Sequence, residues 1–285
     1  MIELSFPIPI SIRMLDYCLE KKGGTMEFFT SPDWFNRSGP YAYTLEHFLF
    51  IAIATLLAVL TGLGLRKTCK KTVRKVCIAL WAATLAIDVI KWVVLYYLVF
   101  TSPESYPFSL DSMLPLHSCS MFMYIFPFGF FFQNKVVTTA SRSFLVNVNM
   151  IMGFITLFVG FPGKGASVFS FFGLHTLLYH SLIFATPLIM LLTEEYRPKK
   201  KDILYGLGLF LGLGAIVLTF DIITGCDYWY FHDGHTFGVL KFIYENVPHF
   251  SIWTIIVTTC YILTALITHF AILAIFALVD KRRAK

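Results

Sequence analysis

The sequence predicts an all-α, polytopic membrane protein with seven transmembrane helices, an N-terminus outside the cell and a C-terminus in the cytoplasm. First, 57% of the 285 residues are hydrophobic and only 14% are charged, whereas soluble domains carry about 25% charged residues. Second, seven apolar stretches reach the roughly 20 residues that a helix needs to cross about 30 Å of hydrocarbon. Third, basic residues gather in alternate connections. These observations exclude a soluble domain.

The predicted spans follow one another with short connections. They cover Thr44–Gly64, Val76–Phe100, Phe108–Phe132, Ser143–Gly160, Val168–Thr193, Ile203–Thr224 and Phe250–Val279. The chain therefore divides into an extracytoplasmic segment (1–43), one membrane domain (44–279) and a basic cytoplasmic tail (280–285). The long connection Gly225–His249 is aromatic and polar, and we expect it to form a lid or an interfacial belt.

Charge fixes the predicted orientation. The segments after spans one, three, five and seven hold Arg66, Lys67, Lys70, Lys71, Arg74, Lys75, Lys135, Arg142, Arg197, Lys199, Lys200, Lys201, Lys281, Arg282, Arg283 and Lys285. Cytoplasmic loops carry such an excess of lysine and arginine. On the opposite side, Asn36-Arg37-Ser38 matches the acceptor pattern for N-glycosylation. Met26 is an alternative start to Met1.

Polar residues inside the spans are expensive and mark candidate sites. Asp88 and Lys91 stand three residues apart on one face of span two. We interpret them as a structural ion pair, with a proton relay or a lipid headgroup contact as the alternative. Asn147 and Asn149 in span four are expected to form hydrogen bonds between helices.

The run Leu114-Pro115-Leu116-His117-Ser118-Cys119-Ser120 places a thiol within span three. On a continuous helix His117 and Cys119 point apart, so a base for Cys119 has to come from another span. Span five offers His175 and His180. Cys119 lies 14 residues before Gln133, and His180 lies 14 residues before Glu194, so this thiol and this imidazole are expected at similar depth. A packing role is the alternative for both.

The same run resembles the YwaF family of integral membrane proteins, which includes a eukaryotic transmembrane protein 164 branch. Weaker similarities lie at Glu27–Pro32 with Glu46-His47, at Phe171-Phe172 with Tyr179-His180-Ser181, and at Asp227–Tyr230, where the family pattern has an asparagine in place of Asp227. The resemblance covers about residues 26–280. It implies a multi-span fold and, in the eukaryotic branch, phospholipid acyl transfer by a cysteine and a histidine. Those residues would be Cys119 and His180.

Two functions follow as hypotheses. The first is a lipid acyltransferase or thioesterase in which His180 deprotonates Cys119, with His117 or Ser118 as a donor to the oxyanion and His175 as a further supporting candidate. The second is a non-enzymatic transporter or receptor-like protein, with Asp88, Lys91 and His269 lining a polar cavity. The expected partners are membrane lipids and not nucleic acid. The six cysteines lack CxxC spacing, so no metal or other cofactor is expected.

Overall fold

The computed structural model describes residues 43–103, 107–160, 168–231, 244, 246, 247 and 249–284. These residues form helices and connections without any strand. The predicted extracytoplasmic segment, with Met26 and the Asn36 acceptor site, lies outside the described residues except for Tyr43.

Six of the described helices are long and apolar enough to cross a membrane, so the chain is an integral, multi-pass membrane protein. Five of them match predicted spans closely. They are α4 (Leu45–Leu65), α5 (Lys70–Thr101), α11 (Phe171–Leu192), α12 (Asp202–Thr224) and α14 (Phe250–Arg283). Side chains at the starts define two of these helices, because Thr44 caps α4 and Ser170 caps α11.

The fourth predicted span belongs to a longer helical run. It comprises α8 (Lys135–Phe144), the π-helical turn η1 (Leu145–Asn149), α9 (Met150–Ile155) and a second π-helical turn, η2 (Thr156–Gly160). The run begins at Lys135, before the predicted start at Ser143, because the Asn134 side chain caps it. This side chain accepts hydrogen bonds from the N–H groups of Val136 and Val137 at 2.9 and 3.2 Å. Extra residues in π-helical turns often occur at functional sites.

The prediction of one continuous helix over Phe108–Phe132 is wrong. That stretch forms α6 (Leu110–Met113), a non-helical segment at Leu114–Ser120, and α7 (Met121–Phe130). Pro115 explains part of the break, since proline has no N–H to donate and biases the preceding residue away from helical backbone. With ten residues, α7 is shorter than a full span.

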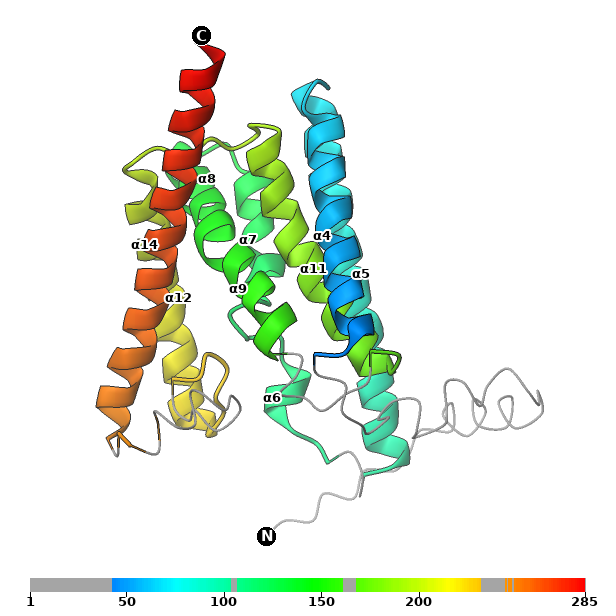
Figure 1. Cartoon of the computed structure of the whole chain (residues 1–285). Coiled ribbons are helices and arrows are strands. Elements are labelled where there is room, and N and C mark those ends of the chain that lie inside the picture. Colours follow the sequence, from blue (N-terminus) through cyan, green and yellow to red (C-terminus); the bar gives the residue numbers. More distant parts are fainter. Residues whose placement is uncertain are drawn as a thin grey trace, which may run out of the picture.

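The helices form a bundle with an inner and an outer set (Figure 1). Helix α11 packs against α4, α5 and α9, while α8 packs against α7 and α12, and α14 contacts η1. Aromatic rings fill the inner part, where Phe126 stacks on Phe130 with ring centroids 4.1 Å apart. This arrangement surrounds the non-helical Leu114–Ser120 segment with protein.

The four basic segments gather at one end of the bundle, where the α4–α5 loop, the α7–α8 loop, the α11–α12 loop and the end of α14 lie (Figure 1). Ion pairs join three of these segments, namely α8, the α11–α12 loop and the end of α14. Arg142 binds Glu195 at 3.2 Å, Arg283 binds Glu194 at 2.9 Å, and Arg197 pairs with Asp280.

Candidate active site

The non-helical segment Leu114–Ser120 is the centre of the candidate site. Backbone that leaves a helix inside a membrane loses its internal hydrogen bonds, so it is tolerated only where protein groups replace them. The Trp229 indole N–H donates to the Leu116 carbonyl at 2.8 Å. The Asn149 amide donates to the carbonyls of Ser118 and Cys119 at 2.8 and 3.3 Å.

Asn149 reaches this segment from the last position of η1 and is fully buried. The sequence predicts hydrogen bonds to another helix, whereas Asn149 bonds to non-helical backbone of the preceding predicted span. Asn147 differs, because its amide donates to Ser143 Oγ within the same helix at 3.0 Å. The sequence alone does not separate the two asparagines, since the π-helical turn determines their directions.

The start of the long connection after α12 also enters the site. Gly225 ends α12 with a left-handed backbone (φ 76°) that favours glycine, and the Asp221 carboxylate accepts from the Tyr228 N–H at 3.2 Å. Tyr228 and Trp229 are fully buried. This part of Gly225–His249 is therefore core and not a lid or surface belt, and residues 232–243 lie outside the described residues.

His117 and Ser118 are held by groups from other elements. His117 Nδ1 lies 2.7 Å from the Tyr228 carbonyl, and the two rings meet edge to face at 5.1 Å. Ser118 Oγ lies 3.1 Å from the Tyr261 hydroxyl of α14. Since the segment is not helical, the helical-wheel reason for separating His117 from Cys119 does not apply. Both polar groups anchor the segment to its surroundings.

Cys119 is half-buried among tyrosine side chains. Tyr179 of α11, Tyr230 and Tyr261 all lie within electrostatic range of its thiol. Burial raises the pKa of Tyr230, and the nearby Tyr261, Cys119 and Asp227 raise it further. No pattern in the sequence marks these tyrosines as a group, because they come from three separate parts of the chain.

His180 lies on α11, directly after Tyr179, and only 7% of it is exposed. Its Nδ1 lies 2.7 Å from the Thr176 carbonyl, which can only accept, so the neutral ring carries its proton on Nδ1. Nε2 is therefore the basic nitrogen. The rings of Tyr179 and His180 meet edge to face at 5.3 Å.

One helix connects the thiol and the imidazole. Asn149 binds the Cys119 carbonyl, and Gly153 stands one turn further along the same face. A Cβ on Gly153 would lie 3.2 Å from the His180 carbonyl, so α9 and α11 cross closely there. The backbones of Cys119 and His180 therefore contact neighbouring turns of η1 and α9.

His175 belongs to a separate cluster around Asp88. Lys91 Nζ and His175 Nε2 lie 3.0 and 3.3 Å from the same oxygen, Asp88 Oδ1. The Asp88 side chain is 2% exposed. His175 also stacks on Tyr179 with centroids 5.3 Å apart, so the cluster touches the ring that lies beside Cys119. The sequence predicts the Asp88–Lys91 spacing but not the third member.

The remaining candidate, His269, lies apart from this site. It is fully buried on α14, near Asp202 and the backbone of Lys199 and Lys200. Helices α5, which carries Asp88, and α14, which carries His269, stand on opposite sides of the bundle (Figure 1). Across the described ranges, no three His, Cys, Asp or Glu side chains are grouped closely enough to hold a metal ion.

The chain was compared with curated proteins, solved structures and family models. No curated protein and no solved structure matches it. A family model described as the TMEM164 family matches residues 42–279, which is most of the chain and includes every site residue above. This match supports the transmembrane protein 164 branch of the resemblance seen in the sequence, and the chain belongs to the TMEM164 family.

Proposed function

We propose that the protein is a membrane-embedded lipid acyltransferase with Cys119 as nucleophile and His180 as base. The observation that carries this proposal is a thiol presented on a non-helical segment inside the bundle, where Asn149 and Trp229 satisfy the backbone. Such irregular backbone at membrane depth is costly and marks function. The run Leu114–Cys119 also carries the resemblance to the wider YwaF family, which we retain as part of the proposal.

The reaction has two halves. His180 Nε2 takes the proton from Cys119 Sγ, and the thiolate attacks the carbonyl carbon of a phospholipid acyl ester. The lysolipid alkoxide leaves with the proton from His180, and a thioester remains on Cys119. A second lysolipid hydroxyl then attacks the thioester while His180 accepts its proton, and the thiolate departs. Water as the acceptor would make the protein a thioesterase.

Tyr179 is the hydroxyl best suited to stabilise the oxyanion. It is buried on α11 within electrostatic range of Cys119, and the Ser120 hydroxyl lies close enough to form a hydrogen bond with it. A donor directed at the developing negative charge is worth most in a water-excluded site. The donors suggested by the sequence are engaged, since Ser118 pairs with Tyr261 and His117 with Tyr228.

The test is acyl exchange by the purified protein with defined phospholipids. Cys119→Ala and His180→Ala should each abolish exchange without lowering the protein level, and the double variant should be no worse, because the two act as one unit. The exposed cysteines provide matched controls, so Cys69→Ala and Cys260→Ala should be silent. Full activity in Cys119→Ala would make the thiol a packing residue.

We also propose that α7 makes a seventh, shorter crossing and that the basic end of the bundle faces the cytoplasm. The grouping of four basic segments at one end, three of them joined by ion pairs, supports this orientation. Reporter fusions after Lys71 and Lys200 should report the cytoplasm, and fusions after Glu104 and Gly234 should report the outside. The reversed pattern would contradict the topology.

The second candidate is a transporter or receptor-like protein, and the buried Asp88 cluster favours it. Acidic and basic groups inside membrane bundles often mark ion or proton pathways. An activity-based thiol probe separates the two functions, since a transporter does not need a hyper-reactive Cys119. Labelling of Cys119 no faster than that of exposed Cys260 would favour the transporter.

A further inference from the structure

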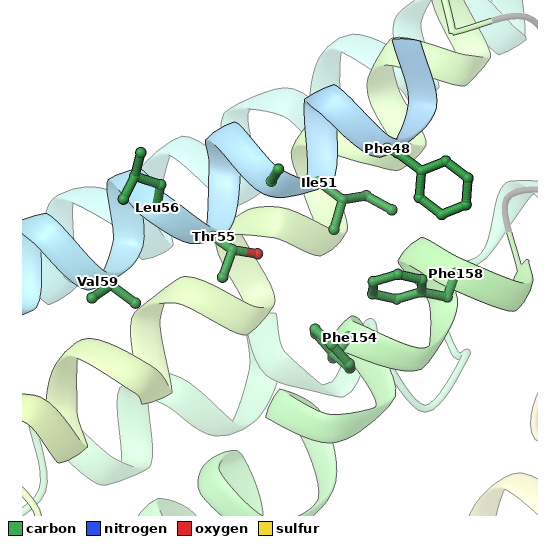
Figure 2. A pocket seen from close by; sticks show the side chains of 8 residues that line it. Phe48, Ile51, Thr55, Leu56, Val59, Phe154 and Phe158 are labelled. Atoms are coloured by element: carbon green, nitrogen blue, oxygen red, sulfur yellow. The ribbon is translucent and has the colours of Figure 1, made fainter. Parts of the chain in front are cut away.

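An apolar groove runs along the outside of the bundle between α4 and the α9–η2 region. Figure 2 shows Phe48, Thr55 and Val59 on one wall and Phe154 and Phe158 on the other. Its volume is about 610 Å³, within the range of about 300–1,000 Å³ that is typical of sites for small molecules. Almost all of the lining is hydrocarbon.

Helix packing creates the groove and closes one end of it. Both α4 and α9 pack against α11, which leaves a channel between them. At the start of α4, His47 Nε2 lies 2.7 Å from the Leu157 carbonyl of η2. Ile51, Leu157 and Leu177 pack together beneath this contact. His47, which the sequence marks only as part of a weak family similarity, thus ties the two walls together.

The length of the groove matches one leaflet of a bilayer. Eleven residues separate Phe48 from Val59, which is about 16 Å along a helix and about half of a hydrocarbon core of about 30 Å. Its open side continues into the lipid-facing surface of α4, where Leu56, Leu57 and Leu60 are all more than half exposed. Water is not a suitable occupant of such an apolar channel within the bilayer.

The groove passes the part of α11 that carries His180. Gly153, next to Phe154, meets the His180 carbonyl at the α9–α11 crossing. Phe154 also packs on Phe184 of α11 with ring centroids 5.2 Å apart. A chain lying in the groove therefore runs beside the turn of α11 that carries the candidate base.

We propose that the groove binds one acyl chain of the phospholipid whose ester reacts at Cys119, an inference that rests on the proposed function. Hydrocarbon tails fill the surrounding membrane, so the groove gains little from the hydrophobic effect and selects its occupant by shape and contact. Phe48 and Phe158 define the closed end, and the chain enters from the open side of α4.

A phospholipid with a photoreactive diazirine in its acyl chain tests this site. After photolysis in membranes, adducts should map to Phe48–Val59 and Phe154–Phe158, in the wild-type chain and equally in Cys119→Ala. Ala52→Trp fills the groove and should remove these adducts. Ile53→Trp is the matched control, because Ile53 is exposed on the same helix but does not line the groove, and it should leave them in place.

The outcomes separate this inference from the proposed function. Loss of exchange activity in Cys119→Ala with no groove adducts would overturn the acyl-chain site and leave the catalytic proposal in place. Groove adducts that depend on Ala52, together with full exchange in Cys119→Ala, would overturn the catalytic proposal and leave an acyl-chain site. Adducts spread evenly over α4, α12 and α14, unchanged by Ala52→Trp, would mean that lipid contacts the whole outer surface and that the groove is not a specific site.

A second experiment places a benzophenone amino acid at Phe158. It should capture lipid, and capture of residues 1–42 or of a second copy of the chain would overturn the assignment.

Discussion

The outer helices and the inner helices of this bundle obey different rules. In the most apolar 18 residues of α4 and of α14, 17% of the residues are buried inside the protein. The corresponding share is 61% in Lys135–Phe158 and 56% in α11. The outer helices are apolar nearly all round and satisfy their own backbone, as lipid requires. The inner ones hold asparagine, histidine and serine among aromatic rings.

This difference shows which parts of the chain need particular side chains in order to fold. The lipid-facing side of a helix needs only length and hydrophobicity, whereas the interior of the bundle supports the broken segment through the side chains of Asn149, Trp229 and Tyr261, the last of which lies on the inward face of α14. Substitutions should therefore be costly at inner polar contacts and nearly silent on outer faces. The predictions below test that contrast, from the largest expected effect to the smallest.

The largest loss of stability is expected at Asp88. Asp88→Asn removes the buried anion between Lys91 and His175 and leaves the partly buried Lys91 ammonium without its partner, at a cost of about 3–5 kcal/mol. Lys91→Met should cost less, because His175 still faces the carboxylate. The double variant Asp88→Asn with Lys91→Met should recover thermal stability in detergent. If the double variant is less stable than either single variant, the cluster has a role other than a structural ion pair.

A smaller loss is expected at Asn149. Asn149→Leu leaves the carbonyls of Ser118 and Cys119 short of a donor, which costs about 1–3 kcal/mol. Asn147→Leu is the control on the same helix, since its amide bonds only to Ser143. The melting temperature in detergent should fall further for Asn149. Equal shifts would mean that Asn149 does not support the non-helical segment.

The last contrast, which includes the smallest expected effect, uses two glycines. Gly153→Ala places a methyl group against His180 and Ile183 and should cost about 1–3 kcal/mol by overpacking. Gly208→Ala on α12 meets nothing within 4 Å and should stabilise by up to about 1 kcal/mol through helix propensity. Shifts of equal sign in thermal stability would contradict the division into inner and outer helices.

The sequence predicts the outer helices well and the inner ones incompletely. Phe250–Val279 and Ile203–Thr224 match the observed helices closely, because a run of apolar residues is sufficient information for a lipid-facing helix. The break at Leu114–Ser120 depends on donors from distant segments, Asn149 and Trp229, which no local pattern contains. Pro115 was the only local signal.

The candidate site shows the same limit. Cys119 and His180 stand out because a thiol and an imidazole are rare at membrane depth, and counting residues to the helix ends indicates similar depth. Tyr179, Tyr230 and Tyr261 look like ordinary aromatic residues in the sequence, and only the fold brings them to Cys119. His175 was grouped with the catalytic candidates, whereas the structure places it against Asp88.

The most direct test of the central claim is the mass of the protein after incubation with a defined phospholipid. The account predicts one acyl group on Cys119, removable by hydroxylamine as a thioester is, and absent from Cys119→Ala and His180→Ala. Tyr179→Phe should slow its formation without changing the alkylation rate of Cys119, because an oxyanion donor acts only in the transition state. Acyl exchange at the wild-type rate in Cys119→Ala, with no adduct on the wild-type thiol, would contradict the account.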